Sequence, residues 1–510
     1  MSAGDRDVVR PAPVADLDWD AERGRAFVDD LADIWEEVLA GLRERPVMRR
    51  VTSQQVREAV AIPVPDAPMP TDDLVAYLRA MALEWSSYLG HPGFMAYVSG
   101  SGTVPGSAAE LLASGLNMNG GGWVLSPAST EIELHLCRWF AQDVFGLGSN
   151  AGGELTSGGA MANLIALKVA RDHRAGWDVR REGVAAGPPL GLYLTTETHV
   201  VSDRAADTLG IGANNVRHIP VGEDRRMRVD ELRAQIARDR TEGIRPFAVV
   251  GSAGTVSTGA IDPLSEIADV CAEEQLWFHV DAAYGGPAML ADDLRPQFAG
   301  IDRADSVAFD PHKWMYTPHS GGCVLARDWS AFGDSFSVYA AYTVQDKEAS
   351  GHGVDLGFHS PNFSRGFWSL KVWVSLLAHG REAYGRRISH DAELARYLGS
   401  RVESRPDFEL CAPVGLSITC FRFVPADLPG DPDDEARERY LSELNQRLMT
   451  QIQFDGRVFC SNAILDGRFT LRTCVVNHRT EAAEMDLVLD VAAELGTKLD
   501  QELRPEGLRP

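Results

Sequence analysis

Short apolar runs alternate with longer amphipathic segments through the middle of the chain. Strand-like runs follow one another between residues 150 and 330, beginning at residues 152, 191, 216, 247, 277 and 306. Helical patterns fill the intervals, for example up to residue 171 and again up to residue 271. This alternation predicts a mostly parallel sheet with right-handed crossovers. Because ligands of such sheets bind beyond the carboxyl ends of the strands, the residues that follow each run are the candidates for chemistry.

The beginning of the chain has a helical pattern. Apolar residues recur at helical spacing over about residues 18–45, and Pro46 ends the pattern, which predicts a helix. Four prolines between residues 63 and 70 then indicate a linker. Thr71 is the expected cap of a second helix, which runs to about Leu89.

The last part of the chain mixes strands and helices. Strand-like segments at 416–423 and 469–474 precede a helix from about Thr480. We therefore expect three parts, namely a helical segment, a large domain and a small domain, at 1–92, 93–373 and 374–510.

Two neighbouring strand ends carry an acid and a lysine. The run at 277–280 ends at Asp281, and the run at 306–309 is followed shortly by Lys313. This pair suits pyridoxal 5′-phosphate (PLP), because a lysine forms a Schiff base with the cofactor aldehyde while a carboxylate keeps the pyridine nitrogen protonated. Alone, Asp281 could equally be a helix cap or a metal ligand, and Lys313 could simply be solvated. Together, in this order, they indicate a cofactor site.

A turn of small residues opens the first helix of the predicted sheet domain. Gly158, Gly159 and Ala160 follow a strand-like run, and Asn163 lies one turn further on. Free backbone N–H groups and the positive end of the helix dipole bind phosphate at such a turn. Glycine turns are common, so the assignment depends on its place upstream of Asp281. His199 and Thr255 also follow strand-like runs, so these residues should meet at one edge of the sheet.

The segments HVDAAYGG and DPHKW resemble the group II PLP-dependent amino-acid decarboxylases, the family of aromatic-amino-acid, histidine and glutamate decarboxylases. Further matching pieces extend from about His91 to Leu495. The resemblance implies the PLP-dependent transferase-like α/β fold (fold type I), with a mostly parallel seven-stranded sheet between helices, an N-terminal helical segment and a small C-terminal α+β domain. It also implies a homodimer with active sites at the interface and decarboxylation of an L-amino acid to its amine.

The resemblance gives several residues a role at the cofactor. His199 stands where the family places the histidine that stacks on the ring, and Ala283 would pack on the opposite face. Thr255 would bond near the ring oxygen or the Asp281 carboxylate, and His312 would reach the phosphate. Asp310 occupies a position where the family commonly has asparagine, which adds negative charge near the phosphate. Asp262, which lies in a matching segment, is expected only to cap the following helix.

Three residues are candidate substrate contacts. Phe94 and Tyr97 belong to a segment that resembles the family's substrate entrance. Arg472 matches an arginine that can bind the substrate carboxylate in glutamate decarboxylases, although it could equally be an ordinary strand arginine. Together with Trp123, the two aromatic residues suggest an aromatic substrate.

One segment departs from the family. Animal and plant members carry a loop tyrosine that protonates the substrate carbon, but here Asp355 or Leu356 stands at its place, and no tyrosine lies between Tyr342 and Ser364. In the family, replacement of this tyrosine by phenylalanine is associated with aldehyde synthases, which decarboxylate and then deaminate oxidatively with O2. We favour an amine-forming decarboxylase with another proton donor. The aldehyde synthase and a PLP-binding protein without turnover are the alternatives, and the candidate donors are Tyr339, Tyr342, His352 and His359.

Composition narrows the setting. The net charge of −24 over 510 residues argues against nucleic acid, which requires a basic surface. Seven cysteines without a C-x-x-C pair indicate reduced thiols. The N-terminus has no apolar signal-peptide core and no stretch has the length of a membrane span, so we expect a cytoplasmic protein without a metal site.

Overall fold

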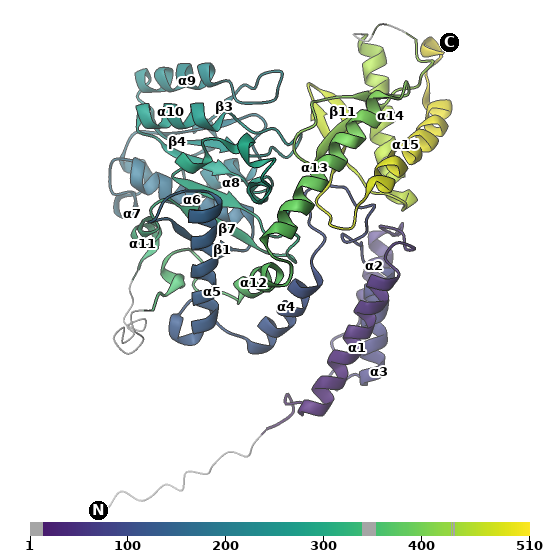
Figure 1. The fold of residues 1–510 in the computed structure, drawn as a ribbon, viewed down its shortest axis with the longest axis horizontal. Coiled ribbons are helices and arrows are strands. Elements are labelled where there is room, and N and C mark those ends of the chain that lie inside the picture. Colours follow the sequence, from purple (N-terminus) through teal and green to yellow (C-terminus); the bar gives the residue numbers. More distant parts are fainter. Residues whose placement is uncertain (1–13, 339–352, 430, 432–433, 510) are drawn as a thin grey trace, which may run out of the picture. The chain divides into compact units, whose positions relative to one another are not determined.

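The computed structural model describes residues 14–338, 353–429, 431 and 434–509 (Figure 1). The chain divides into two compact units, Met1–Ser87 and Tyr88–Pro510. Among the described residues, no helix has both the length and the apolar character needed to cross a bilayer.

The first unit is helical, as predicted. Its helices are α1 (Ala21–Ala40), α2 (Ser53–Val60) and α3 (Thr71–Glu84). The predicted cap at Thr71 is wrong, because Pro70 takes the N-cap position without a side-chain bond and Thr71 already lies in the helix. Helix α2 was not predicted, although Thr52 and Gln55 form a reciprocal capping box at its start.

The second unit contains the predicted sheet. Its seven strands stand in the order β1-β7-β6-β5-β4-β2-β3. The neighbours β3, β2, β4, β5 and β6 run parallel, and β7 is antiparallel to both β6 and β1. The strands are Gly152–Thr156 (β1), Leu190–Thr195 (β2), Val216–Ile219 (β3), Arg245–Ser252 (β4), Trp277–Asp281 (β5), Ser306–Phe309 (β6) and Gly322–Ala326 (β7).

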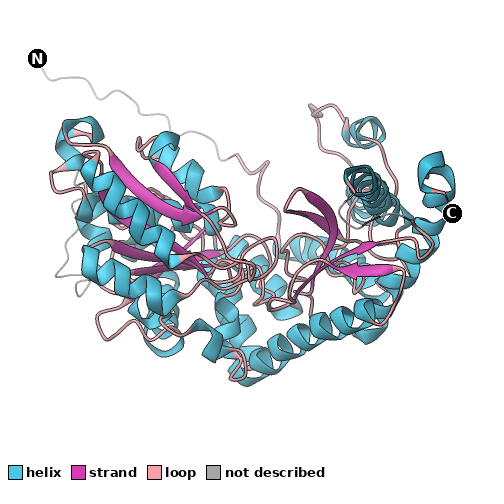
Figure 2. Ribbon diagram, turned by 90° about the horizontal axis from the view of Figure 1, so that it is seen from above, coloured by secondary structure: helices cyan, strands magenta, loops and turns pink. Residues whose placement is uncertain are grey.

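Helices cover both faces of this sheet (Figure 2), which is why its strands read as apolar runs without alternation. Along β4, Val249 belongs to the same core cluster as residues of α9 and α10. Its neighbours Ala248 and Val250 belong to the cluster that contains residues of α6 and α8. The helices of this part are α4 (Val104–Leu116), α5 (Pro127–Arg138), α6 (Gly159–Arg174), α7 (Val179–Glu182), α8 (Val201–Thr208), α9 (Val229–Thr241), α10 (Leu264–Glu274) and α11 (Ser330–Phe336).

The C-terminal part has its own antiparallel sheet, in the order β10-β11-β9-β8. The strands predicted near residues 416–423 and 469–474 are β9 and β11, and the helix predicted from Thr480 is α15. The predicted domain boundary at residue 373 falls inside α12 and stays a prediction. The elements are α12 (Trp368–His379), α13 (Arg381–Glu403), β8 (Phe408–Leu410), β9 (Ile418–Phe423), α14 (Glu435–Asp455), β10 (Ser461–Leu465), β11 (Arg468–Cys474) and α15 (Ala482–Leu503).

Asp262 does not cap α10, contrary to the sequence prediction. Pro263 is the N-cap of that helix, with no side-chain cap bond. The buried Asp262 carboxylate instead accepts the backbone N–H groups of Ser252 and Met227, both at 2.8 Å. It therefore ties the end of β4 to the segment that leads into α9.

Candidate active site

All but one of the predicted site residues line a single cavity. Its volume is about 500 Å³, and it opens at the carboxyl ends of the parallel strands. The exception is Phe94, which is buried against Phe459 with ring centroids 5.5 Å apart. The predicted residues that line the cavity are Tyr97, Gly158, Gly159, Ala160, Asn163, His199, Thr255, Asp281, Ala283, Asp310, His312, Lys313 and Arg472.

The ends of β5 and β6 place an acid and a lysine in this cavity. Asp281 is the last residue of β5, and its Oδ1 accepts the backbone N–H of Ala283 at 3.0 Å. Lys313 follows β6 and its Nζ lies 2.9 Å from Oδ2 of Asp310. Parallel pairing, in which Asp281 faces Ala308, holds the two strand ends side by side.

The start of α6 forms the predicted anion turn. Gly158 is the N-cap, with a φ of 153°, and no side chain caps the helix. A Cβ on Gly159 would lie 2.7 Å from Asp310 Oδ2, and one on Gly322 would lie 2.5 Å from the Gly158 carbonyl carbon. Side chains would therefore crowd this turn, and the glycines leave room for an anion beside its backbone. The N–H of Gly158 itself donates to Thr156 Oγ1 at 3.3 Å.

A buried hydrogen-bond chain supports the turn from below. The Trp277 indole donates to Ser306 Oγ at 2.8 Å, and His279 bonds both Ser306 Oγ and Asn163 Oδ1 at 2.8 Å. The Asn163 amide then donates to the Gly159 carbonyl at 2.9 Å. Because the amide oxygen of Asn163 can only accept, His279 carries its hydrogen on Nε2. Asn163 thus lies at the cavity wall, and its side chain bonds to His279 and Gly159 and so supports the turn.

His199 and Thr255 approach the cavity from the ends of β2 and β4. Burial lowers the pKa of His199 below its usual value, although the Asp281 charge opposes this, so the imidazole is neutral near pH 7. Its Nδ1 accepts the Val201 N–H at 3.3 Å, which places the hydrogen of the neutral ring on Nε2. Thr255 Oγ1 contacts Thr258 Oγ1 at 3.1 Å and accepts the N–H of Ala260 at 3.2 Å; its predicted contact with Asp281 is not among the bonds formed by the described residues.

The small sheet contributes Arg472 to the cavity, and this residue is 3% exposed. Nη1 of Arg472 donates to Ser461 Oγ at 3.1 Å. Within the described part of the chain, its Nε and Nη2 have no hydrogen-bond partner. These two nitrogens form one edge of the guanidinium, the edge that binds a carboxylate with two parallel bonds. Tyr97 lies at the same side, and its backbone N–H donates to Ser461 Oγ at 3.2 Å.

Several lining residues were not predicted. Ser252 and Ser257 come from the end of β4 and the loop after it, and the strand-end rule that found Asp281 could have found Ser252. Ser461 and Asn462 come from β10. They carried no local signal, because the small sheet reaches the cavity through long-range contacts such as the bond from Met95 N–H to the Phe459 carbonyl, at 2.8 Å.

The segment that lacks the family tyrosine is partly described. Asp355 accepts the backbone N–H of Trp123 at 2.9 Å, and Leu356 is fully buried. His359 packs against Trp329 with ring centroids 4.7 Å apart. None of these three is among the described residues that line the cavity. The other candidate donors, Tyr339, Tyr342 and His352, lie outside the described residues.

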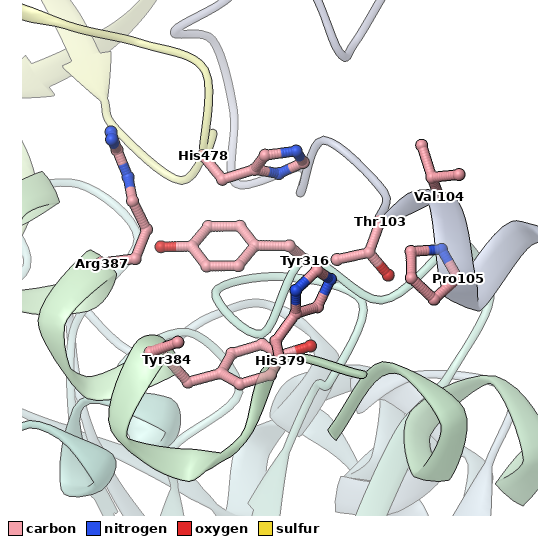
Figure 3. A pocket seen from close by; sticks show the side chains of 9 residues that line it. Thr103, Val104, Pro105, Tyr316, His379, Tyr384, Arg387 and His478 are labelled. Carbon is pink, nitrogen blue, oxygen red and sulfur yellow. The ribbon is translucent and has the colours of Figure 1, made fainter. Parts of the chain in front are cut away.

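A second cavity, of about 290 Å³, contains none of the predicted residues (Figure 3). Tyr316, three residues after Lys313, lies between His478 and Tyr384, with ring centroids 5.6 Å and 6.3 Å away (Figure 3). Its hydroxyl donates to the buried Asp391 at 2.6 Å. This packing fixes the chain just beyond the lysine.

The residues of the larger cavity fit PLP. The anion turn suits the phosphate, the Asp281 carboxylate suits a protonated pyridine nitrogen, and Lys313 provides an amine. Two features indicate a bound polar group in addition: the unpartnered edge of Arg472, and Oδ1 of Asp310, which also has no partner among the described residues.

Fold and site together define a PLP-dependent enzyme of fold type I. Residues 54–424 match the model of the pyridoxal-dependent decarboxylase conserved domain, and the chain belongs to this family. It is 32% identical over 470 residues to an aromatic-L-amino-acid decarboxylase of Bacillus atrophaeus, a match covering 92% of this chain and 94% of the relative. It is 28% identical over 488 residues to a phenylacetaldehyde synthase of Arabidopsis thaliana, covering 94% and 96% of the two chains.

Solved structures give the same assignment. The crystal structure of Oryza sativa TDC with PLP and tryptamine superposes with a TM-score of 0.87 at 26% identity, covering 94% of this chain and 99% of that chain. The predicted fold, the cofactor and the class of enzyme, a PLP-dependent carboxy-lyase acting on an amino acid, are thereby confirmed.

The neutral state of His279 predicts a pH-dependent stability. Burial lowers the pKa of His279 to about 4, whereas an unfolded imidazole titrates near about 6.5. Between these values the unfolded chain binds the extra proton, so stability is full above about pH 6.5 and falls towards pH 4, by up to about 1.4 kcal/mol per pH unit for this residue. The free energy of unfolding, measured with urea at a series of pH values, should therefore fall less steeply with decreasing pH for His279→Gln than for the native protein. His218→Gln, at a partly exposed site on β3, is the control, and equal slopes for His279→Gln and the native protein would contradict the expectation.

Proposed function

We propose that this enzyme decarboxylates an aromatic L-amino acid to its amine, with Lys313 as the residue that bonds to PLP. The observation that carries the proposal is the meeting of Asp281, Lys313 and the α6 turn in one cavity. When bound, the cofactor supplies an electron-withdrawing ring that accepts the electron pair left by departing CO2. The protein's own residues hold the cofactor, orient the substrate and deliver protons.

Asp281 holds a proton on the pyridine nitrogen. The residue is 7% exposed, and its Oδ1 accepts the Ala283 N–H at 3.0 Å. A carboxylate so placed stabilises positive charge on the nitrogen. The first turn of α6 holds the phosphate through Gly158, Gly159 and Ala160.

His199 covers the reacting centre as a neutral imidazole. Since its Nδ1 accepts the Val201 N–H, its Nε2–H is the group free to donate. This orientation supports a role in hydrogen bonding to the substrate or in proton delivery.

Arg472 binds the α-carboxylate of the substrate and thereby orients the bond that breaks. Its unpartnered Nε and Nη2 make it a two-pronged donor. Among the described residues that line the cavity, the lysine and arginine side chains are Lys313, which would bond to PLP, and Arg472. A second carboxylate, on an acidic substrate side chain, would find no further cation there. Tyr97 and Tyr284 instead offer aromatic surface, which supports an aromatic substrate, as does the Bacillus relative.

The product depends on proton delivery to the substrate carbon. The absence of a tyrosine between Tyr342 and Ser364 is the observation that favours the second candidate, oxidative deamination to an aldehyde. The named activity of the Arabidopsis relative belongs to that class. We favour the amine, because His199 lies in the cavity with a hydrogen to give.

We further propose that the enzyme is a homodimer of the cytoplasm. Helix α4 presents an apolar face of Leu111, Leu112 and Leu116, which are 57%, 56% and 48% exposed. Large apolar side chains exposed together on one helix face suit a protein interface, and a second copy is the partner that the family resemblance implies. All seven cysteines are unpaired, which supports a reducing compartment.

Aerobic incubation of the PLP-loaded protein with L-tyrosine, L-tryptophan and L-phenylalanine, following CO2, amine, aldehyde and H2O2 together, tests the function. We expect CO2 and amine in equal amounts, without H2O2, and no CO2 from Lys313→Ala. Aldehyde with H2O2 would establish the second candidate. Bound cofactor without CO2 from any of these three amino acids would refute both.

Replacing Arg472 by leucine should raise KM for the amino acid by about tenfold to a hundredfold, the loss of about 1.5–3 kcal/mol of charged hydrogen bonding. Arg472→Lys should recover only part of the lost substrate affinity, because lysine cannot bind a carboxylate with two parallel hydrogen bonds. Affinity for PLP should not change. Arg468→Leu, on the same strand but 43% exposed, is the matched control. An unchanged KM in Arg472→Leu would exclude carboxylate binding.

Introducing Leu112→Asp and Leu116→Asp should shift the protein from dimer to monomer in sedimentation velocity, because two charges would be buried in the interface. Ile464→Asp, at an apolar site of similar exposure on β10, should leave the dimer intact. A native protein that sediments as a monomer would refute the homodimer.

A further inference from the structure

The Asp310 carboxylate lies against the same turn that we assign to the cofactor phosphate. Asp310 is 1% exposed, and its Oδ2 is 2.7 Å from the place of a Cβ on Gly159, the first residue of α6. The carboxylate also lines the cavity. Two acidic groups, one from the protein and one from the cofactor, would thus share one end of the site.

The two oxygens of Asp310 are in different situations. Oδ2 pairs with Lys313 Nζ at 2.9 Å. Oδ1 is buried and has no hydrogen-bond partner among the described residues. A buried carboxylate oxygen left without a donor is costly, so Oδ1 is available to a group bound in the cavity.

The charged and titratable groups around Asp310 come from several elements. Burial raises the pKa of Asp310 above its usual value; Lys313 opposes this shift, and Asp281, at the end of β5, adds to it. Nε2 of His312 lies 3.9 Å from Oδ2 of Asp310. Burial is the main cause that lowers the pKa values of His312 and His319 to about 4, so neither imidazole carries charge near pH 7. The first turn of α6 contributes Gly159, Ala160 and Met161, none of them charged. Lys313 is therefore the counter-charge of Asp310.

We propose that Asp310 takes up a proton when PLP binds and then, as a neutral carboxylic acid, donates a hydrogen bond from Oδ1 to the cofactor phosphate. The inference rests on the proposed function, which places the phosphate at the α6 turn. A phosphate ester carries about −1.5 to −2 charges near pH 7, and an ionised carboxylate beside it is strongly disfavoured. Protonation removes that repulsion and converts the unpartnered oxygen into a donor.

Proton uptake on binding determines the direction in which PLP affinity changes with pH. PLP affinity falls as pH rises, because free Asp310 must gain a proton that becomes scarcer. Between the pKa of Asp310 in the free protein and the higher pKa in the complex, the contribution of this residue to Kd is a rise of up to about tenfold per pH unit.

The test uses the full chain and the variant Asp310→Asn, whose amide donates without needing a proton. Asp305→Asn, at the other end of β6, is the matched control, since Asp305 accepts the Phe278 N–H at 2.8 Å and does not line the cavity. The probe is pyridoxine 5′-phosphate, which has the phosphate but no aldehyde and so cannot bond to Lys313. Kd is measured between about pH 6 and about pH 8.5, and proton uptake is measured by calorimetry in two buffers of different ionisation enthalpy.

We expect the affinity of the native protein and of Asp305→Asn for the probe to fall with rising pH more steeply than that of Asp310→Asn, by up to about tenfold per pH unit. Per bound ligand, these two proteins should also take up as much as about one proton more than Asp310→Asn does. Titration of the probe itself is common to all three proteins and cancels. Pyridoxine, which lacks the phosphate and likewise has no aldehyde, should bind the native protein and Asp310→Asn with the same pH dependence.

Parallel slopes and equal proton uptake for the native protein and Asp310→Asn would overturn the inference. The proposed function would then still stand if CO2 and amine are formed. If pyridoxine 5′-phosphate binds none of the three proteins, the assignment of the phosphate to the α6 turn is wrong, and the inference fails with it. Circular dichroism and thermal midpoints matching those of the native protein establish that Asp310→Asn is folded.

Discussion

The parallel pairing of β5 with β6 is the constraint on which the site depends. In this register His279 faces Ser306 and Asp281 faces Ala308. The bond from Ala282 N–H to the Ala308 carbonyl, at 2.8 Å, and that from Asp310 N–H to the Ala283 carbonyl, at 3.1 Å, continue the pairing past the strand ends. Because parallel strands end at one edge of a sheet, this ladder brings the acid and the lysine together. A shift by one residue would turn the side chains of β5 to the opposite faces.

Below this edge, β5 and β6 also provide the side chains that support the turn at the start of α6. His279 and Ser306 form a pair across the ladder, and Asn163 connects that pair to the Gly159 carbonyl. The Asp281 end of β5 and the turn at the start of α6 therefore share one rigid frame. Since each member of this chain is buried and hydrogen-bonded, the frame needs no counter-ion and stays neutral at pH 7.

Burial controls the charge of the whole site. The imidazoles of His199, His312 and His319 have lowered pKa values because desolvation disfavours their charged forms. Positive charge in the cavity then comes from Lys313 and Arg472 and from backbone dipoles. The buried Asp310 carboxylate adds negative charge beside Lys313, and on our proposal this couples cofactor binding to proton binding.

Local patterns in the sequence determined much of this protein. Apolar runs predicted the parallel strands, and the strand ends predicted Asp281, Lys313 and the glycine turn, because backbone direction and residue spacing are local properties. Resemblance to a family then supplied PLP and decarboxylation. Tertiary structure decided what local patterns could not. It assigned Asp262 to the backbone of Ser252 and Met227 instead of a helix cap, and it committed Asn163 to His279. It also left one edge of Arg472 without a partner among the described residues. These outcomes depend on atoms distant in sequence that compete for the same donors and acceptors, and only folding brings those competitors within hydrogen-bonding distance.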